Sequence, residues 1–200
     1  MPRHPLVPAS SRQNRSLRGQ ISLQTTPRSC LPPVDRSKPW FPLAGSAMDG
    51  WSNEEEATAT CFCGAVQLKF PTQGPGLVQS FICNCGDCHK ITASMFASNF
   101  TIADSHLTHV RGRENLSTFS QSRTVASGNT MTNHFCKTCG TLMYRVSSGF
   151  PGKSILRIGT IDDFHLHETK LKPSVEMFIE RRVAWLKGAE GVKQVEGSAL

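Results

Sequence analysis

Seven cysteines, gathered in three short clusters, constrain this sequence more than any other feature. The clusters are Cys61-Phe62-Cys63, Cys83-Asn84-Cys85-Gly86-Asp87-Cys88 and Cys136-Lys137-Thr138-Cys139, and the eighth cysteine, Cys30, lies far upstream. We find no apolar run of the length that spans a bilayer and no apolar core of a secretory signal. In a reducing compartment, clustered thiols are more often metal ligands than disulfides. The fold is therefore expected to bring these cysteines together around metal ions.

The first and third clusters together supply the four ligands of one zinc site. In the third cluster, a two-residue gap followed by Gly140 lets the chain turn around a metal, which is typical of a zinc knuckle. The first cluster has a one-residue gap, so an extended strand presents both of its thiols on the same side. The two pairs predict a structural zinc that ties distant parts of a small β fold together, with the ligands Cys61, Cys63, Cys136 and Cys139.

The middle cluster is one ligand short of a closed zinc site, because it offers only Cys83, Cys85 and Cys88. A histidine could close the site, and His89 and His134 are the nearest in sequence. His89 is a poor candidate, since adjacent side chains diverge. His134 precedes the third cluster at a spacing that favours a place near the first zinc. An open three-cysteine site is the better interpretation.

Zinc with three protein ligands and one exchangeable position is the arrangement of a catalytic site. Three thiolates leave the complex with one net negative charge, which makes it a weaker Lewis acid toward water than a site of three histidines and favours sulfur at the open position. We therefore expect a thiol substrate that ionises on binding. Basic neighbours are expected to balance the charge and to assist proton transfer, and the candidates are His89 and Lys90.

Short strand-like runs begin at about residue 58. Val66, Leu68 and Phe70 alternate with their neighbours at the two-residue period of a half-buried strand. Turn residues such as Gly128-Asn129 separate the later runs. A helical turn or two is expected only over residues 180–187. The pattern predicts an all-β domain with strands near residues 66–70, 77–83, 95–102, 115–119, 130–135, 141–146 and 155–161.

The first 47 residues differ from the rest in charge and composition. They carry six of the seven net positive charges, are rich in Pro, Ser and Arg, and lack periodic apolar positions, so we expect them to be disordered. Such a segment resembles a mitochondrial presequence or a nucleic-acid- or membrane-seeking arm, but prolines at positions 2, 5 and 8 break a presequence helix. An extension without a role is the leading interpretation. The chain then divides into a disordered extension (1–47), a zinc-binding domain (48–190) and a flexible tail (191–200). We expect it to be cytoplasmic, or mitochondrial if the extension is a presequence.

Residues from about 60 to 185 resemble the glutathione-dependent formaldehyde-activating enzyme (GFA) family, also called the centromere-protein-V/GFA domain. The matching motifs are Cys-x-Cys-Gly-Ala-Val at 61–66, Cys-x-Cys-x-x-Cys at 83–88, Phe-Cys-x-x-Cys-Gly-Thr at 135–141, Gly-Thr-Ile-Asp-Asp at 159–163, and Trp185. The resemblance implies a β-tent, Mss4-like fold with two Zn²⁺ per chain, one in a closed four-cysteine site and one in a catalytic three-cysteine site. The chain departs from the family pattern at three places. His89 replaces a common Arg, Ala93-Ser94 replaces a Gly, and Glu176 replaces a frequent His.

The resemblance also implies carbon–sulfur bond chemistry, in which glutathione and formaldehyde combine to S-hydroxymethylglutathione. We predict a zinc-dependent carbon–sulfur lyase that acts on an adduct of glutathione, or a related thiol, with formaldehyde or another small carbonyl. Glutathione is the expected co-substrate. The alternative is a zinc-stabilised binding module for protein or nucleic acid, without catalysis. An under-coordinated metal favours the enzyme, and the dispersed basic residues of the extension predict neither specific nucleic-acid binding nor a membrane partner.

Overall fold

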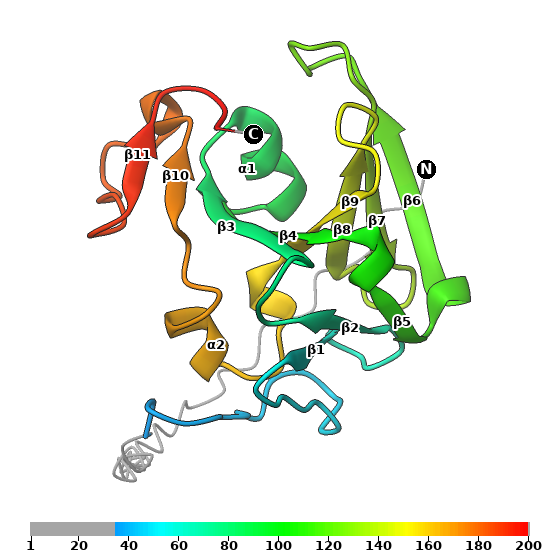
Figure 1. The fold of residues 1–200 in the computed structure, drawn as a ribbon. Coiled ribbons are helices and arrows are strands. Elements are labelled where there is room, and N and C mark those ends of the chain that lie inside the picture. Colours follow the sequence, from blue (N-terminus) through cyan, green and yellow to red (C-terminus); the bar gives the residue numbers. More distant parts are fainter. Residues whose placement is uncertain (1–34, 200) are drawn as a thin grey trace, which may run out of the picture. The chain divides into compact units, whose positions relative to one another are not determined.

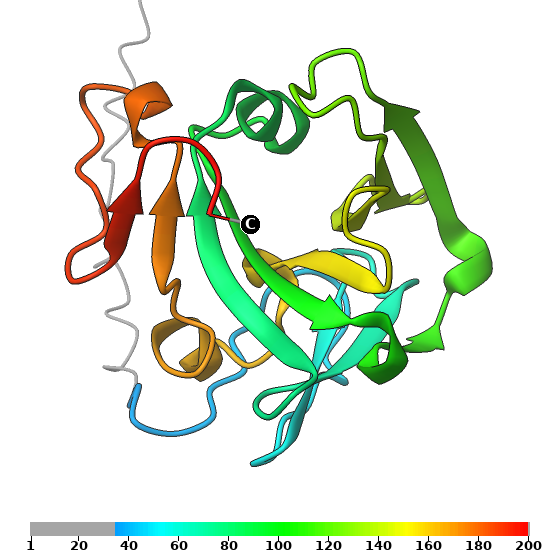
Figure 2. The same ribbon diagram turned by 45° about the horizontal axis from the view of Figure 1, so that its top comes forward.

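Two β-sheets form the framework of residues 35–199, the part of the chain that this computed structural model describes (Figures 1 and 2). The small sheet is antiparallel and has the order β1-β2-β5, with strands Glu56–Thr60 (β1), Gln67–Pro71 (β2) and Thr108–Arg111 (β5). The large sheet has eight strands in the order β11-β10-β3-β4-β9-β8-β7-β6. In chain order they are Leu77–Cys83 (β3), Ala97–Ala103 (β4), Leu116–Gln121 (β6), Met131–Cys136 (β7), Leu142–Ser147 (β8), Lys153–Arg157 (β9), Val175–Met177 (β10) and Lys193–Val195 (β11). The all-β prediction is confirmed.

The helices are short. Residues 35–199 contain two α-helices, Gly86–Thr92 (α1) and His165–Glu168 (α2), and four 3₁₀ turns, Asp104–His106 (η1), Arg113–Asn115 (η2), Ile158–Thr160 (η3) and Ile179–Arg181 (η4). Of the helical segment expected over residues 180–187, the structure shows only the end of η4, at residues 180 and 181, and residues 182–187 are not helical. Helix α1 joins β3 to β4, and in both views it lies at the opposite end of the domain from β1 and β2 (Figures 1 and 2). None of the helices in the described part of the chain has the length and apolar character needed to cross a bilayer.

Two hydrophobic clusters fill the domain. In the larger one, Leu68 and Phe70 of the small sheet pack on Phe100 and Leu156 of the large sheet, and the rings of Phe70 and Phe100 have centroids 4.7 Å apart. Burying each such side chain contributes about 1.5–3 kcal/mol. The second cluster surrounds the middle group of cysteines and consists of Phe81, Cys83, Cys88, Ala97, Ile155, Val175 and Met177. The three-cysteine site therefore lies within a core of its own.

Both ends of the predicted domain differ from expectation. Residues 35–47, which we assigned to the disordered extension, contact the domain, because the apolar stretch 39–43 interrupts the basic sequence. The backbone N–H of Trp40 donates to Asp163 Oδ1 at 2.8 Å, and the Trp40 ring meets Phe164 edge-on with centroids 5.6 Å apart. Within the predicted flexible tail, β11 pairs in parallel with β10. The remainder of the predicted extension, residues 1–34 with Cys30, lies outside the described residues.

Candidate functional site

The ends of β1 and β7, with the turns that follow them, bring together the four cysteines of the first and third clusters. Cys61 follows β1 and Cys63 lies in the turn to β2, while Cys136 ends β7 and Cys139 lies in the turn to β8. In the second turn, Gly140 has a φ of +76°, a left-handed conformation that favours glycine, and its N–H donates to Cys136 O at 2.8 Å. The four sulfurs all lie within 4.8 Å of one another. This is the group of cysteines that the spacing predicted.

The spacing of the four sulfurs suits a tetrahedral metal. Cys63 Sγ lies 3.6 Å from Cys61 Sγ and 3.7 Å from Cys136 Sγ. Zinc–sulfur bonds of about 2.3 Å at tetrahedral angles separate the sulfurs by about 3.8 Å, so the residues fit a zinc ion. Without a cation, burial raises the pKa of Cys61 to about 12. A metal would remove this penalty, because it binds the thiolate form.

Three hydrogen bonds orient the sulfurs of this site. The N–H of Val66 donates to Cys61 Sγ, Asn115 Nδ2 donates to Cys136 Sγ, and Thr141 Oγ1 lies within hydrogen-bond distance of Cys139 Sγ, each at 3.2 Å. Such contacts fix the direction of metal ligands and stabilise their charge. Although burial raises the pKa of Cys139, the hydrogen bonds from Thr141 outweigh it and hold the value at about 6.

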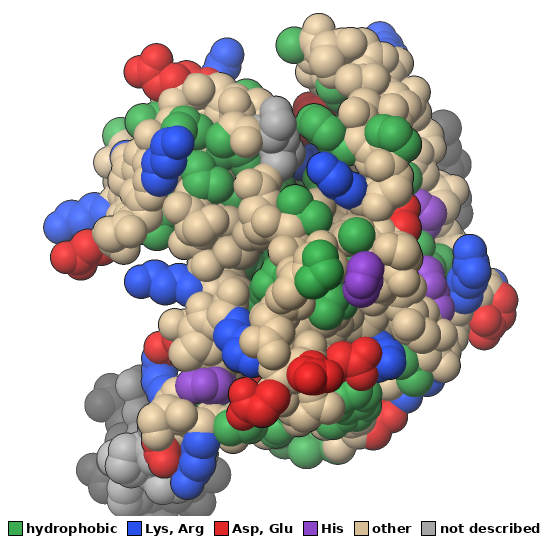
Figure 3. All heavy atoms as spheres, viewed as in Figure 1, with side chains coloured by type: hydrophobic (Ala, Val, Ile, Leu, Met, Phe, Trp, Pro, Cys, Tyr) green, Lys and Arg blue, Asp and Glu red, His purple; other side chains and the backbone are tan. Residues whose placement is uncertain are grey.

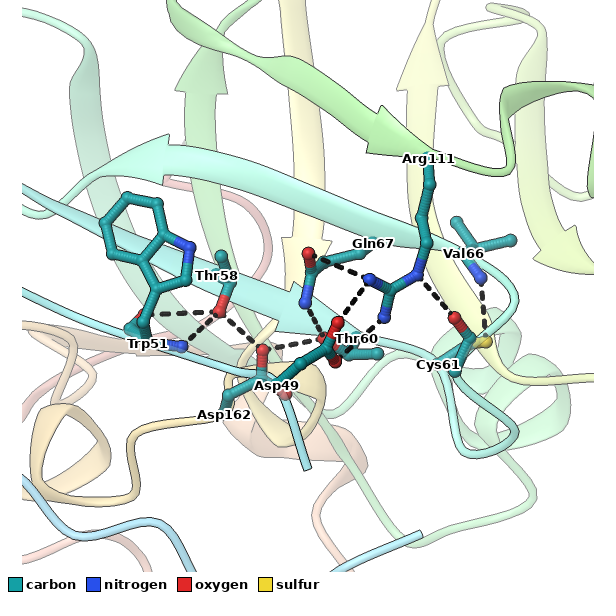
Figure 4. Close-up of polar contacts among 10 residues, drawn as sticks. Asp49, Trp51, Thr58, Thr60, Cys61, Val66, Gln67, Arg111 and Asp162 are labelled. Atoms are coloured by element: carbon teal, nitrogen blue, oxygen red, sulfur yellow. Dashed lines mark hydrogen bonds and ion pairs between the residues drawn. The ribbon is translucent and has the colours of Figure 1, made fainter. Parts of the chain in front are cut away.

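Arg111 of β5 holds the turn that carries Cys61 (Figure 4). Its Nε donates to Gly64 O at 2.7 Å, and its guanidinium forms a two-point ion pair with Asp49 at 2.5 and 3.0 Å. Nearby, the hydroxyls of Thr58 and Thr60 donate to Asp162 Oδ2 at 2.6 and 2.7 Å. Asp162 belongs to the Gly-Thr-Ile-Asp-Asp motif. This aspartate therefore ties β1 to the chain that follows β9, which is a structural task.

The second cysteine group forms where β3 passes into α1. Cys83 is the last residue of β3, Cys85 caps the start of α1, and Cys88 lies in the first turn of the helix. Their sulfurs lie within 4.8 Å of one another, and Cys83 and Cys88 are buried while Cys85 is partly exposed. Because β3 ends and α1 begins within these six residues, the three thiols lie around one point.

No fourth ligand completes this group among residues 35–199, because neither a histidine nor a carboxylate lies close enough to all three sulfurs. His89 is in α1, and its Nε2 is buried without a hydrogen-bond partner in the described structure. Lys90 is exposed on the same helix. His134, which we expected near the first metal, stacks on Tyr144 with ring centroids 4.3 Å apart and joins neither group. The three cysteines therefore fit a metal with one position left for another ligand.

Glu176 of β10 holds the loop between Cys83 and Cys85. The buried Asn84 donates from Nδ2 to Glu176 Oε1 at 3.0 Å and to Met177 O at 3.2 Å. Arg182 pairs with the same carboxylate at 3.0 Å. Although burial raises the pKa of Glu176, the hydrogen bonds from Arg182 and Asn84 outweigh it and keep the pKa below its usual value. In this chain, Glu176 is a positioning residue for the cysteine loop.

Sequence reasoning missed two arginines beside the cysteines. Arg145 of β8 and Arg157 of β9 are buried, and Arg145 Nη1 lies 3.7 Å from Cys88 Sγ. Hydrogen bonds from the other two thiols, followed by the charges of the two arginines, lower the pKa of Cys88 to about 2. Burial lowers the pKa of Arg157 to about 10, so it stays charged at neutral pH. The sequence did contain a signal that could have identified these arginines, because each is a charged residue inside an apolar run, 142–146 or 155–161.

Comparison with known proteins identifies the family of this chain. The model of the glutathione-dependent formaldehyde-activating enzyme (GFA) family matches residues 56–181, a span that holds both cysteine groups. The chain belongs to the GFA family. Among solved structures, the GFA chain is similar to a Rhodobacter sphaeroides protein determined as a structural genomics target. The two share 26% identity over 52% of this chain and 85% of that chain, with a TM-score of 0.41. No curated protein matches.

Proposed function

We propose that this GFA-family protein is a zinc-dependent carbon–sulfur lyase. It would join glutathione, or a related thiol, to formaldehyde or another small carbonyl, and cleave the adduct in reverse. The observation that supports this proposal most strongly is the group of three cysteines without a fourth ligand among the described residues. Zinc held by Cys83, Cys85 and Cys88 supplies a soft Lewis-acidic centre with a coordination position free for sulfur.

The chain itself must move a proton. Adduct formation makes one bond between sulfur and the carbonyl carbon, and the proton lost by the thiol ends on the carbonyl oxygen. His89 follows Cys88 directly, and its Nε2 is buried with no partner among residues 35–199. An imidazole has one nitrogen that accepts a proton and one that donates, so His89 can take a proton from sulfur and return it to oxygen. Lys90 is exposed, which limits its proposed role to adding positive charge near the site.

Exchange spectroscopy with ¹³C-labelled formaldehyde and glutathione tests this function. The protein should speed the exchange between free formaldehyde and the S-hydroxymethyl adduct beyond the spontaneous rate. Cys85→Ser should remove the acceleration while the circular dichroism spectrum is unchanged. His89→Gln should reduce the rate and retain both metals, whereas His106→Gln, which alters an exposed histidine, should match the unmodified protein.

The opposite outcome leads to the binding-module alternative. Exchange no faster than in buffer for every thiol tested, together with loss of one metal in His89→Ala or His134→Ala, would show that a histidine closes the site. The chain would then be a zinc-stabilised scaffold. On the face in Figure 3, Lys and Arg side chains are scattered and form no continuous patch, which gives nucleic-acid binding no support there.

A further inference from the structure

One face of the large sheet carries both buried arginines and the three-cysteine group. Arg145 of β8 is opposite Ile155 of β9, and Arg157 lies two residues further along the same strand. Cross-strand partners, and residues two apart in a strand, share a face of the sheet. Ile155 also packs in the cluster that contains Cys83 and Cys88. The two guanidinium groups therefore lie on the side of the sheet that faces the cysteines.

The same face gathers polar atoms without partners. Thr101 is opposite Ile155, and Asn133 is opposite Arg145. Thr101, Asn133, Arg145 and Arg157 are each at most 8% exposed. Five of their side-chain atoms are buried and have no hydrogen-bond partner in the described structure: Thr101 Oγ1, Asn133 Oδ1, Arg145 Nε, Arg157 Nε and Arg157 Nη2. Buried polar groups are nearly always satisfied, so this cluster of unsatisfied ones marks a place where water or a polar ligand would bind.

The charges on this face favour an anion. Neither arginine forms an ion pair with an aspartate or glutamate of residues 35–199. Arg157 Nη1 donates to Asn99 Oδ1, which is neutral. A divalent metal held by three thiolates carries one net negative charge, whereas two guanidinium groups carry two positive charges. One positive charge remains before a ligand binds, and a substrate thiolate at the metal would offset it. The planar guanidinium groups keep unpaired N–H donors, which are suited to a carboxylate.

We propose that Arg145 and Arg157, with Thr101 and Asn133 beside them, bind the carboxylate of an anionic thiol whose sulfur occupies the open position of the three-cysteine site. This assignment rests on the proposed function and narrows its substrate to thiols that carry a carboxylate. Arg145 Nη1 is only 3.7 Å from Cys88 Sγ, so a thiol with a short chain between sulfur and carboxylate can reach both groups. Figure 3 shows a notch in the surface between the side that carries β10 and β11 and the loop from β6 to β7.

Two thiols that differ only in charge provide the test. Cobalt replaces zinc in the full-length protein, and 3-mercaptopropionate or 3-mercaptopropionamide is titrated while the thiolate charge-transfer bands are followed. The carboxylate should bind at least about tenfold more tightly than the amide, since a hydrogen bond to a charged group contributes about that factor. Arg145→Gln and Arg157→Gln should each lower this ratio by about fivefold or more. Arg181→Gln, which removes an equal charge from an exposed position, should preserve the ratio.

The outcomes separate this inference from the proposed function. If neither thiol changes the cobalt spectrum of the unmodified protein, the open site and the lyase proposal fail together. If both thiols bind with equal affinity, the carboxylate site alone is refuted. The ratio in the unmodified protein decides the question even where a glutamine variant fails to fold. A ratio that survives both arginine substitutions in folded variants also contradicts the assignment.

Discussion

Replacing one cysteine of each group with serine should distinguish a metal site that the fold requires from one that it does not require. Cys139 and Cys85 form a matched pair, because both are partly exposed and serine at either position loses little apolar packing. The four-cysteine group joins Cys63 to Cys136, which are 73 residues apart. The other group lies within one strand-to-helix turn. Because the four-cysteine group closes the longer segment of chain, losing its metal should lower the free energy of unfolding more.

Chain entropy gives the size of that difference. Cross-linking residues 73 apart restricts the unfolded chain by about 4.4 kcal/mol, whereas closing a segment of five residues does so by about 2 kcal/mol. Structural zinc sites also supply about 10–16 kcal/mol of apparent binding free energy, comparable with the whole stability of a domain at about 5–15 kcal/mol. Cys139→Ser should therefore abolish cooperative unfolding. Cys85→Ser should cost at most a few kcal/mol.

Thermal unfolding by circular dichroism, with native mass spectrometry to count metals, provides the assay. The expected result is one cooperative transition and one remaining metal for Cys85→Ser, and no transition for Cys139→Ser. Equal losses of stability in the two variants would refute the division into a structural and a catalytic site. Lys137→Ser, at an exposed position in the same turn as Cys139, is the control and should unfold like the unmodified protein.

Three further predictions concern the elements around the site. Ala93 ends α1 with a φ of +51°, a left-handed conformation that favours glycine, so Ala93→Gly should raise the free energy of unfolding in urea by about 0.5–1 kcal/mol; a decrease would contradict the strain. The pKa of Glu176 is lowered in the folded state, so its stabilisation is present above the unfolded value of about 4.3 and is lost as the pH falls through the folded value. Glu176→Gln should flatten this acid limb of the stability profile, and an unaltered profile would exclude the linkage. A chain that begins at Met48 should melt several degrees below one that begins at Asp35, since residues 35–47 contact the domain; identical melting temperatures would show that these contacts contribute nothing.

The cysteine groups were predictable because the ligand pattern is local. Two pairs and a triplet reveal their chemistry through gaps of one or two residues, whatever the fold around them. Strand β3 was predicted with the bounds that the structure shows, since it is a short, mostly apolar run bounded by the turn at Gly76 and by the middle cysteine cluster. Helix α1 was missed, because Gly86–Thr92 contains one buried residue and no apolar period. The three-residue strands β10 and β11 are too short for any period.

Local sequence patterns could not place the two buried arginines beside the cysteines. Arg145 and Arg157 come together with Asn133 and Thr101 through the register of four strands, which the sequence does not encode in any single segment. Segment 35–47 illustrates the same limit in reverse. Its basic composition predicted disorder, yet the contacts of Trp40 with residues 163 and 164 depend on a turn more than a hundred residues away.

Sulfur coordination at the metals tests the central claim most directly. X-ray absorption at the metal edge, on protein with two ions bound, should show the seven cysteine sulfurs shared by the two sites and one lighter ligand at the open position. Addition of 3-mercaptopropionate should replace the lighter ligand with one more sulfur. A spectrum that already contains a histidine nitrogen, and that stays unchanged with every thiol, would contradict an open three-cysteine site.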